Sequence, residues 1–132
     1  MRPIDPFFAA GEVLYRSIGR GDVARGAVKG SSLRLHVSVQ RDAHGGTVAT
    51  AGARDAARAG VATITARDVW ALPAAGGIRA ACVDDPLGAD ESHAMIAFVS
   101  IAEPATEDTE TMKRQLREHL AASFAVRVPP PR

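Results

Sequence analysis

The sequence is poor in cysteine, in aromatic residues and in long apolar runs. A single cysteine, Cys82, excludes an internal disulfide framework and favours a reducing compartment. Aromatic residues make up only 5% of the chain, so alanine, valine and leucine must supply most of the core. No segment approaches the ~20 consecutive apolar residues of a membrane span, and the first six residues hold an acid and two prolines where a signal peptide is apolar. These absences predict a cytoplasmic protein without a membrane segment.

A dense basic run is also absent, although the charge is unevenly spread. The net charge is +1, yet residues 1–60 hold nine Lys/Arg against five Asp/Glu, and residues 61–105 hold two against six. No aromatic residues are interleaved with the basic ones, as they would be on many nucleic-acid-binding surfaces. We therefore expect the basic and acidic regions to neutralise each other, and nucleic acid is not an expected partner.

The length of 132 residues fits one domain with its own core. Period-two alternation and turn signals predict strands and helices whose order favours an α+β fold. Strands are expected at residues 12–18, 33–41, 61–65, 78–83, 94–101 and 125–128, and helices at 47–59, 68–72 and 106–123. We expect a mostly antiparallel sheet of about five strands, packed on the C-terminal helix and one or two short helices. An arm (1–11) and a proline-rich tail (129–132) flank the domain (12–128).

The glycine-rich segment 19–32 invites comparison with a phosphate-binding loop. Gly21 and Gly26 have the spacing of such a loop, but Ala27 and Val28 stand where lysine and serine or threonine are needed. A dinucleotide fingerprint fails because its third glycine is replaced by Ala24. We therefore interpret the segment as a flexible surface connection.

Two groups of polar residues are candidates for a binding surface. Arg34, His36, Ser38 and Gln40 alternate with apolar residues, so the pattern predicts one polar face of a half-buried strand. The second group, in residues 84–96, places acids, a serine and His93 in a turn before a buried strand. From the second group we take Asp84 and Asp85 as binding candidates, together with Arg34, His36 and Gln40 from the first.

A metal site is not expected from these residues. His36, His44, His93 and the Asp84-Asp85 pair offer suitable ligand atoms, but no His-x-x-x-His or Cys-x-x-Cys pair fixes two of them. No cofactor is expected either. Cys82 stands close to Asp84, whose charge would raise the thiol pKa, so we expect it to be a buried and unreactive residue.

Two enzyme families share short motifs with the chain. His36-Val37-Ser38 resembles the His-x-Ser/Thr strand of two-histidine phosphoesterases, but the second copy, His93-Ala94-Met95, lacks the hydroxyl. Arg16, then Ser38, then Glu91 or Glu103, is similar in order to ADP-ribosyltransferase-like folds, which implies a nucleotide site. Arg16 also lies on the apolar side of its predicted strand, where it needs a carboxylate, a phosphate or backbone carbonyls as partners.

Over most of its length the chain resembles a group of small uncharacterised bacterial proteins. The shared pattern is E-x-LYR (from Glu12), L-x-x-SV (around Ser38), GVA (from Gly60), DP (at Asp85) and HA-x-I (from His93). The resemblance implies a compact α+β domain that serves as an accessory or partner-binding component.

Two functions follow from these observations. The first is a protein-binding or accessory module, with a protein partner or self-association through the polar strand face or the turn before His93. The alternative is a small nucleotide-directed enzyme with Arg16, Ser38 and His93 as catalytic residues. The enzyme requires these three side chains to converge on one pocket, whereas the module allows them to lie apart.

Overall fold

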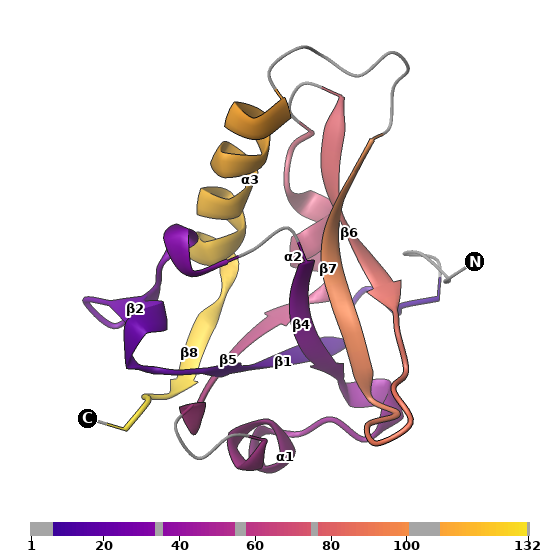
Figure 1. The fold of residues 1–132 in the computed structure, drawn as a ribbon. Helices are drawn as coiled ribbons and strands as arrows, with labels where there is room; N and C mark the ends of the chain where they lie inside the picture. The colour runs from indigo at the N-terminus through magenta and orange to yellow at the C-terminus, as the bar shows by residue number, and fades with distance from the viewer. Residues whose placement is uncertain (1–6, 34–35, 55–57, 75–76, 101–108, 132) are drawn as a thin grey trace.

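The computed structural model describes residues 7–33, 36–54, 58–74, 77–100 and 109–131. Six strands form one antiparallel sheet in the order β6-β7-β4-β1-β5-β8 (Figure 1). Their bounds are β1 Val13–Ile18, β4 His36–Arg41, β5 Gly60–Thr65, β6 Ile78–Asp84, β7 His93–Ser100 and β8 Ala125–Val128. The predicted α+β fold is confirmed, with six strands in the main sheet where about five were expected.

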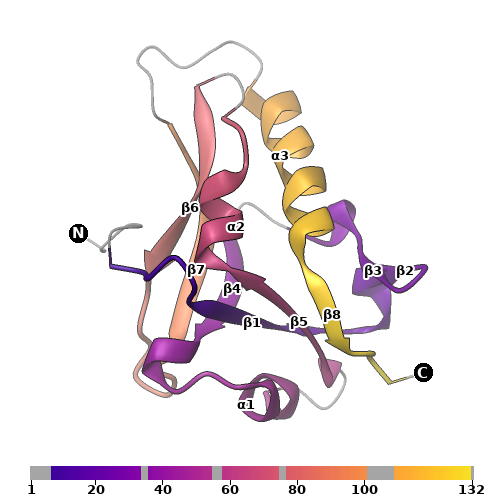
Figure 2. The same ribbon diagram turned by 180° about the vertical axis from the view of Figure 1, so that it is seen from behind.

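The sheet is strongly curled; α2 (Ala66–Ala71) and α3 (Thr109–Ser123) pack on its inner side, and α1 (Val48–Ala53) lies against its outer side. β1 and β5 run across the molecule at a steep angle to β4, β6 and β7 (Figures 1 and 2). The helices α2 and α3 pack against β6, and α2 also contacts β5. The third helix, α1, contacts β1 and β5. None of the described helices is long and apolar enough to cross a bilayer.

Alternation along the strands supplies one continuous core. Leu14 and Ile18 of β1 are fully buried, and so is Val37 of β4, as the period-two pattern predicts. On α3, Leu116 and Leu120 lie one turn apart and are also buried, which confirms the predicted core stripe. Cys82 is buried on β6, as expected from the sequence.

The helix predicted over residues 47–59 is shorter than its alanine content suggested. Thr47 caps it, because its hydroxyl accepts a hydrogen bond from the Thr50 N–H at 3.0 Å, but α1 ends after six residues at Ala53. Gly60 was expected to terminate this helix; instead it opens β5. A Cβ there would lie 2.9 Å from the Ile18 carbonyl oxygen and 2.7 Å from Pro130 N, so Gly60 allows two backbone segments to approach closely.

The glycine-rich segment forms a small hairpin with a short helical turn on each side. Its strands are β2 (Val23–Ala24) and β3 (Ala27–Val28), between the 3-10 turns η1 (Arg20–Asp22) and η2 (Gly30–Ser32). Arg25 and Gly26 both have positive φ, 54° and 78°, which is the conformation of a two-residue type I′ turn. A specific hairpin therefore replaces the flexible connection expected from the sequence.

Candidate functional site

Arg41, at the end of β4, lies at the centre of a buried charge cluster. Its Nε and Nη2 donate to the two carboxylate oxygens of Glu12 at 3.0 and 2.8 Å, and its Nη1 donates to Asp84 at 3.2 Å. Nη2 also donates to the Phe7 carbonyl at 2.8 Å, and the guanidinium stacks 3.8 Å from the ring centroid of Phe8. The side chain is only 4% exposed, and its bonds to Glu12 raise the pKa of Arg41.

The acidic turn predicted as a binding site contributes to this cluster and to the burial of His93. His93 is 5% exposed, and its Nδ1 lies 2.8 Å from the Asp85 carbonyl oxygen and 3.3 Å from the Asp85 carboxylate. Because a carbonyl only accepts, Nδ1 carries the hydrogen. Asp84 binds Arg41, and the exposed His44 stands 3.7 Å from the same carboxylate oxygen. These side chains connect β4, β6 and β7, so their polar atoms are engaged in bonds within the protein and not presented to a partner.

The polar strand face predicted on β4 is only partly accessible. His36 is exposed and Ser38 is half-buried, but Gln40 is 5% exposed and accepts a hydrogen bond from the Thr50 hydroxyl at 2.6 Å. Arg34 lies outside the described residues. Sequence alternation could not reveal the burial of Gln40, because its cover comes from α1.

Arg16, Ser38 and His93 occupy different parts of the sheet. The register pairs Tyr15 with Gln40 and Gln40 with His93, so alternation places Ser38 and His93 on the outer face and Arg16 on the opposite, inner face. Arg16 does reach β4, but its Nη1 donates to the backbone carbonyl of Ser38 at 3.0 Å. The three side chains therefore do not share one face of the sheet.

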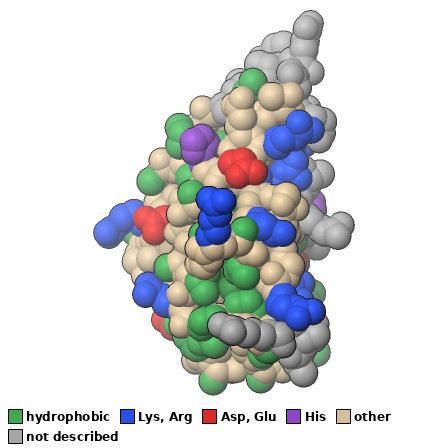
Figure 3. Space-filling view, turned by 90° about the vertical axis from the view of Figure 1, so that its left-hand side faces the viewer, with side chains coloured by type: hydrophobic (Ala, Val, Ile, Leu, Met, Phe, Trp, Pro, Cys, Tyr) green, Lys and Arg blue, Asp and Glu red, His purple; other side chains and the backbone are tan. Residues whose placement is uncertain are grey.

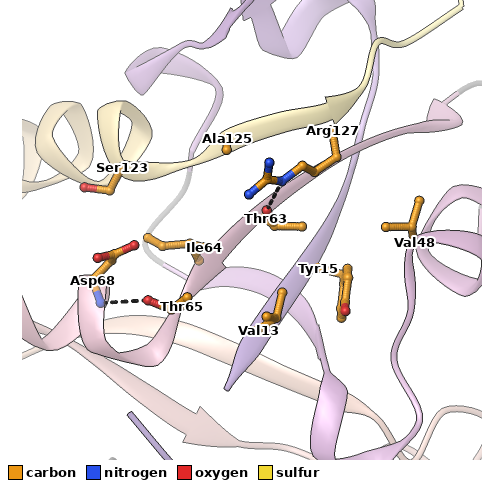
Figure 4. Close-up of a pocket in the computed structure, with 10 residues that line it drawn as sticks. All are labelled: Val13, Tyr15, Val48, Thr63, Ile64, Thr65, Asp68, Ser123, Ala125 and Arg127. Atoms are coloured by element: carbon orange, nitrogen blue, oxygen red, sulfur yellow. Dashed lines mark hydrogen bonds between the residues drawn. The ribbon is translucent and has the colours of Figure 1, made fainter. Parts of the chain in front are cut away.

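The outer face of β1, β5 and β8 is hollowed into a groove of about 350 Å³ (Figure 4). Cross-strand pairs form its floor: Val13 lies opposite Thr65, and Tyr15 lies opposite Thr63, which in turn faces Ala125. Val48 of α1, 40% exposed, stands at one side, and Asp68 of α2 and Ser123 of α3 border the other (Figure 4). The floor is mixed, with hydroxyls and small apolar side chains in alternation.

A β-bulge aims Arg127 across this floor. Val61 pairs with Val128 and Ala62 with Val126, so Arg127 is left without a Cα partner between them. Its Nε donates to the Thr63 hydroxyl at 3.0 Å, as Figure 4 shows. Among the residues that the structure describes, only Nε has an acceptor, and Arg127 is exposed, so its two terminal nitrogens are available for an acceptor from outside.

Tyr15 and Asp68 give the groove its remaining polar character. The Tyr15 hydroxyl donates to Asp42 at 3.2 Å, and burial, followed by the Asp42 charge, raises the pKa of Tyr15. Asp68 is exposed in the first turn of α2, where its backbone N–H is capped by Thr65 at 3.2 Å. The groove thus has a cation over its floor and an acid at its border (Figure 4).

Two further hollows have weaker chemical character. One, of about 400 Å³, is lined by His44, Pro86 and Glu91. Another, of about 260 Å³, lies between η2 and α3, where Arg114 and Arg117 stand beside Glu118. A Cβ on Gly30 would lie 2.3 Å from a Glu118 oxygen, so this glycine allows close contact with a carboxylate. Figure 3 shows the side of the molecule that carries α3 and the hairpin, where acidic side chains interrupt the Lys and Arg side chains.

Sequence reasoning missed the groove because its residues come from six separate elements. The alternation of Val13, Tyr15 and Ser17 against Leu14 and Ile18 did mark an outer face on β1. Nothing in the sequence paired that face with Thr63 or placed Arg127 over it, because the pairing depends on strand order and the bulge.

Metal ligands and similarity to known proteins were two further possible indications of function. Among the described residues, no three His, Cys, Asp or Glu side chains are grouped so that they could hold a metal ion. Comparison with protein-family models, with curated proteins and with solved structures found no match to this chain.

Proposed function

We propose that the chain is a non-catalytic protein-binding module that holds an extended, acidic segment of a partner protein in the groove of β1, β5 and β8. The observation that carries this proposal is Arg127, held over an open sheet face by Thr63 with its terminal nitrogens unused. A guanidinium fixed in this way presents a fork that matches the two oxygens of a carboxylate.

The rest of the groove suits an extended peptide. Side chains of an extended segment alternate, so with an acid over Arg127 the residue two positions away also faces the floor, where Val13, Val48 and Ala125 favour an apolar side chain. Asp68 at the border favours a basic or polar residue at the other end of the segment. The charges of the groove therefore favour one direction of binding.

The enzyme interpretation has less support from the geometry. It needs Arg16, Ser38 and His93 around one pocket, but Arg16 is on the inner face of the sheet and the other two are on the outer face. The Nδ1 of His93 is already bonded to Asp85, and His93 is 5% exposed. Separation of the three side chains is what the module interpretation allowed.

A displayed library of random peptides tests the proposed module. We expect the parent protein to enrich peptides that contain Asp or Glu two positions away from an apolar residue. Arg127→Glu should bind these peptides at least tenfold more weakly, because a charge-assisted hydrogen bond contributes about 1.5–3 kcal/mol. The matched control is Arg114→Glu, an exposed arginine on α3 outside the groove, which should bind them as the parent does.

The same experiment can refute the proposal. Peptides that bind the parent and Arg127→Glu equally well would show that the groove is not the docking site. A library without any enriched peptide would contradict an acidic segment as the ligand. Self-association of the parent alone, measured by sedimentation equilibrium, would instead indicate that a second copy of the chain occupies the groove.

A further inference from the structure

The strands β1 and β4 separate beyond a short contact, and Arg16 lies where they part. They pair only at Leu14 with Arg41 and at Tyr15 with Gln40. Beyond these pairs the Arg16 side chain bridges the two strands, because its Nη1 donates to the Ser38 carbonyl at 3.0 Å. A cationic side chain is thereby held in the gap by one neutral acceptor.

A second arginine is anchored beside it. Arg58 donates through Nη2 to the carbonyl of Ser17, the residue after Arg16, at 3.1 Å, and to the Asp22 carboxylate at 3.0 Å. In return the Ser17 hydroxyl donates to the Arg58 carbonyl. These bonds fix the Arg58 guanidinium against the backbone of β1 next to the origin of Arg16.

Each of the two guanidiniums has a buried donor without an acceptor. The Nε atoms of Arg16 and Arg58 are buried and have no hydrogen-bond partner in the structure. Within the described chain, Arg16 Nη2 and Arg58 Nη1 also form no hydrogen bond, and the Arg58 side chain is 40% exposed. A charged donor left without an acceptor is costly, so a bound anion would be stabilising here.

The electrostatics agree with this geometry. Burial is the largest cause that lowers the pKa of Arg16 to about 10; the positive charges of Arg58 and Arg54 contribute to the same shift, and the charge of Asp22 opposes it. Among the described residues, three cations and one carboxylate therefore act on one another at this place.

We propose that Arg16 and Arg58 form a binding site for a phosphate group, either as inorganic phosphate or as a phosphate monoester. A phosphate carries about −1.5 to −2 charges at pH 7, which suits two neighbouring guanidinium groups better than the single charge of a carboxylate does. Guanidinium groups also donate to phosphate oxygens in a bidentate manner. The site lies apart from the groove and does not depend on the proposed peptide.

Titration calorimetry with inorganic phosphate, at constant ionic strength in chloride, tests this site. We expect the parent to bind phosphate with one site per chain, and Arg16→Gln and Arg58→Gln to bind at least tenfold more weakly. The matched control is Arg67→Gln, an exposed arginine on α2, which should bind as the parent does. Because Arg58→Gln also loses the Asp22 contact, Arg58→Lys serves as a second variant that keeps the charge but loses the fork.

Each outcome decides the proposal. Phosphate binding that is weakened in both Arg16→Gln and Arg58→Lys, and kept in Arg67→Gln, supports the site. A parallel titration with adenosine monophosphate and glycerol phosphate then identifies the source, since the tighter ligand shows whether an ester is preferred. No heat of binding at millimolar phosphate, or equal binding by Arg16→Gln and the parent, overturns it.

Discussion

The two ends of the β1–β4 pair each hold an arginine on the inner face of the sheet, and the two arginines are in opposite situations. Arg41 uses Nε, Nη1 and Nη2 in bonds to Glu12, Asp84 and the Phe7 carbonyl, and these bonds raise its pKa. Within the described residues Arg16 has the Ser38 carbonyl as its single acceptor, and its pKa falls to about 10. The local supply of acceptors, and not burial by itself, separates an arginine that holds the fold from one that awaits a ligand.

Replacement of Arg41 should have the largest effect. We expect Arg41→Met to lower the free energy of unfolding by about 3–5 kcal/mol, because it leaves Glu12 buried at 4% exposure without its cation. The measurement is urea unfolding followed by the single tryptophan, Trp70, with midpoint and slope fitted together.

A double variant separates the charge from the packing. In Arg41→Met with Glu12→Gln, the buried carboxylate is removed as well, so part of the lost stability should return. A loss below about 1 kcal/mol in the single variant would place Arg41 among weak surface ion pairs. Arg41 would then not be the strongly stabilising residue that the comparison with Arg16 requires.

Much of the fold, but little of the site, can be predicted from the sequence. The alternation of Leu33, Val37 and Val39 and the stripe of Leu116 and Leu120 are local patterns, and they marked buried faces correctly. Each pattern lies within one element, where a period of two or of 3.6 residues relates sequence directly to a face.

The sites depend on contacts between elements that are distant in the chain. The requirement of Arg16 for a partner could be predicted, but the acceptor that it finds, the Ser38 carbonyl, is set by where β1 and β4 separate. Gln40 followed the polar alternation of β4 and is nevertheless buried, because Thr50 of α1 covers it. Arg127 reaches Thr63 only because a bulge turns it, and no short sequence motif marks that bulge.

Replacement of Arg16 should act in the opposite direction from replacement of Arg41. A shift from 12.5 to about 10 corresponds to roughly 3 kcal/mol as an upper bound, and the lost bond to Ser38 offsets about 1 kcal/mol of it. We therefore expect Arg16→Met to raise the free energy of unfolding by about 1–2 kcal/mol at pH 7. The parent is thus expected to be less stable than Arg16→Met, a trade-off between stability and function that is common at binding sites.

The pH dependence gives the control for this prediction. The folded-state pKa of Arg16 is depressed, so its penalty is fully present below about pH 10 and is relieved as the pH rises from there toward 12.5. The advantage of Arg16→Met over the parent should therefore shrink in alkaline urea titrations. A variant that is less stable than the parent at pH 7, or an advantage that grows above pH 10, would show that Arg16 is as well compensated as Arg41.

In the groove, the pKa of Tyr15 also depends on burial and on one neighbouring charged residue, but we expect a smaller effect here. Burial raises its pKa first, and the charge and hydrogen bond of Asp42 raise it further, so Asp42→Asn should lower the pKa back toward 10 without removing the whole shift. Tyr15 is the only tyrosine, so phenolate absorbance reports it alone. Asp68→Asn is the matched control at the groove border, and it should leave the titration unchanged. A raised folded-state pKa means that stability falls as the pH rises above 10, so Asp42→Asn should also weaken that fall. An equal response to Asp68→Asn would show that the general charge of the groove, and not the Asp42 contact, raises the pKa of Tyr15.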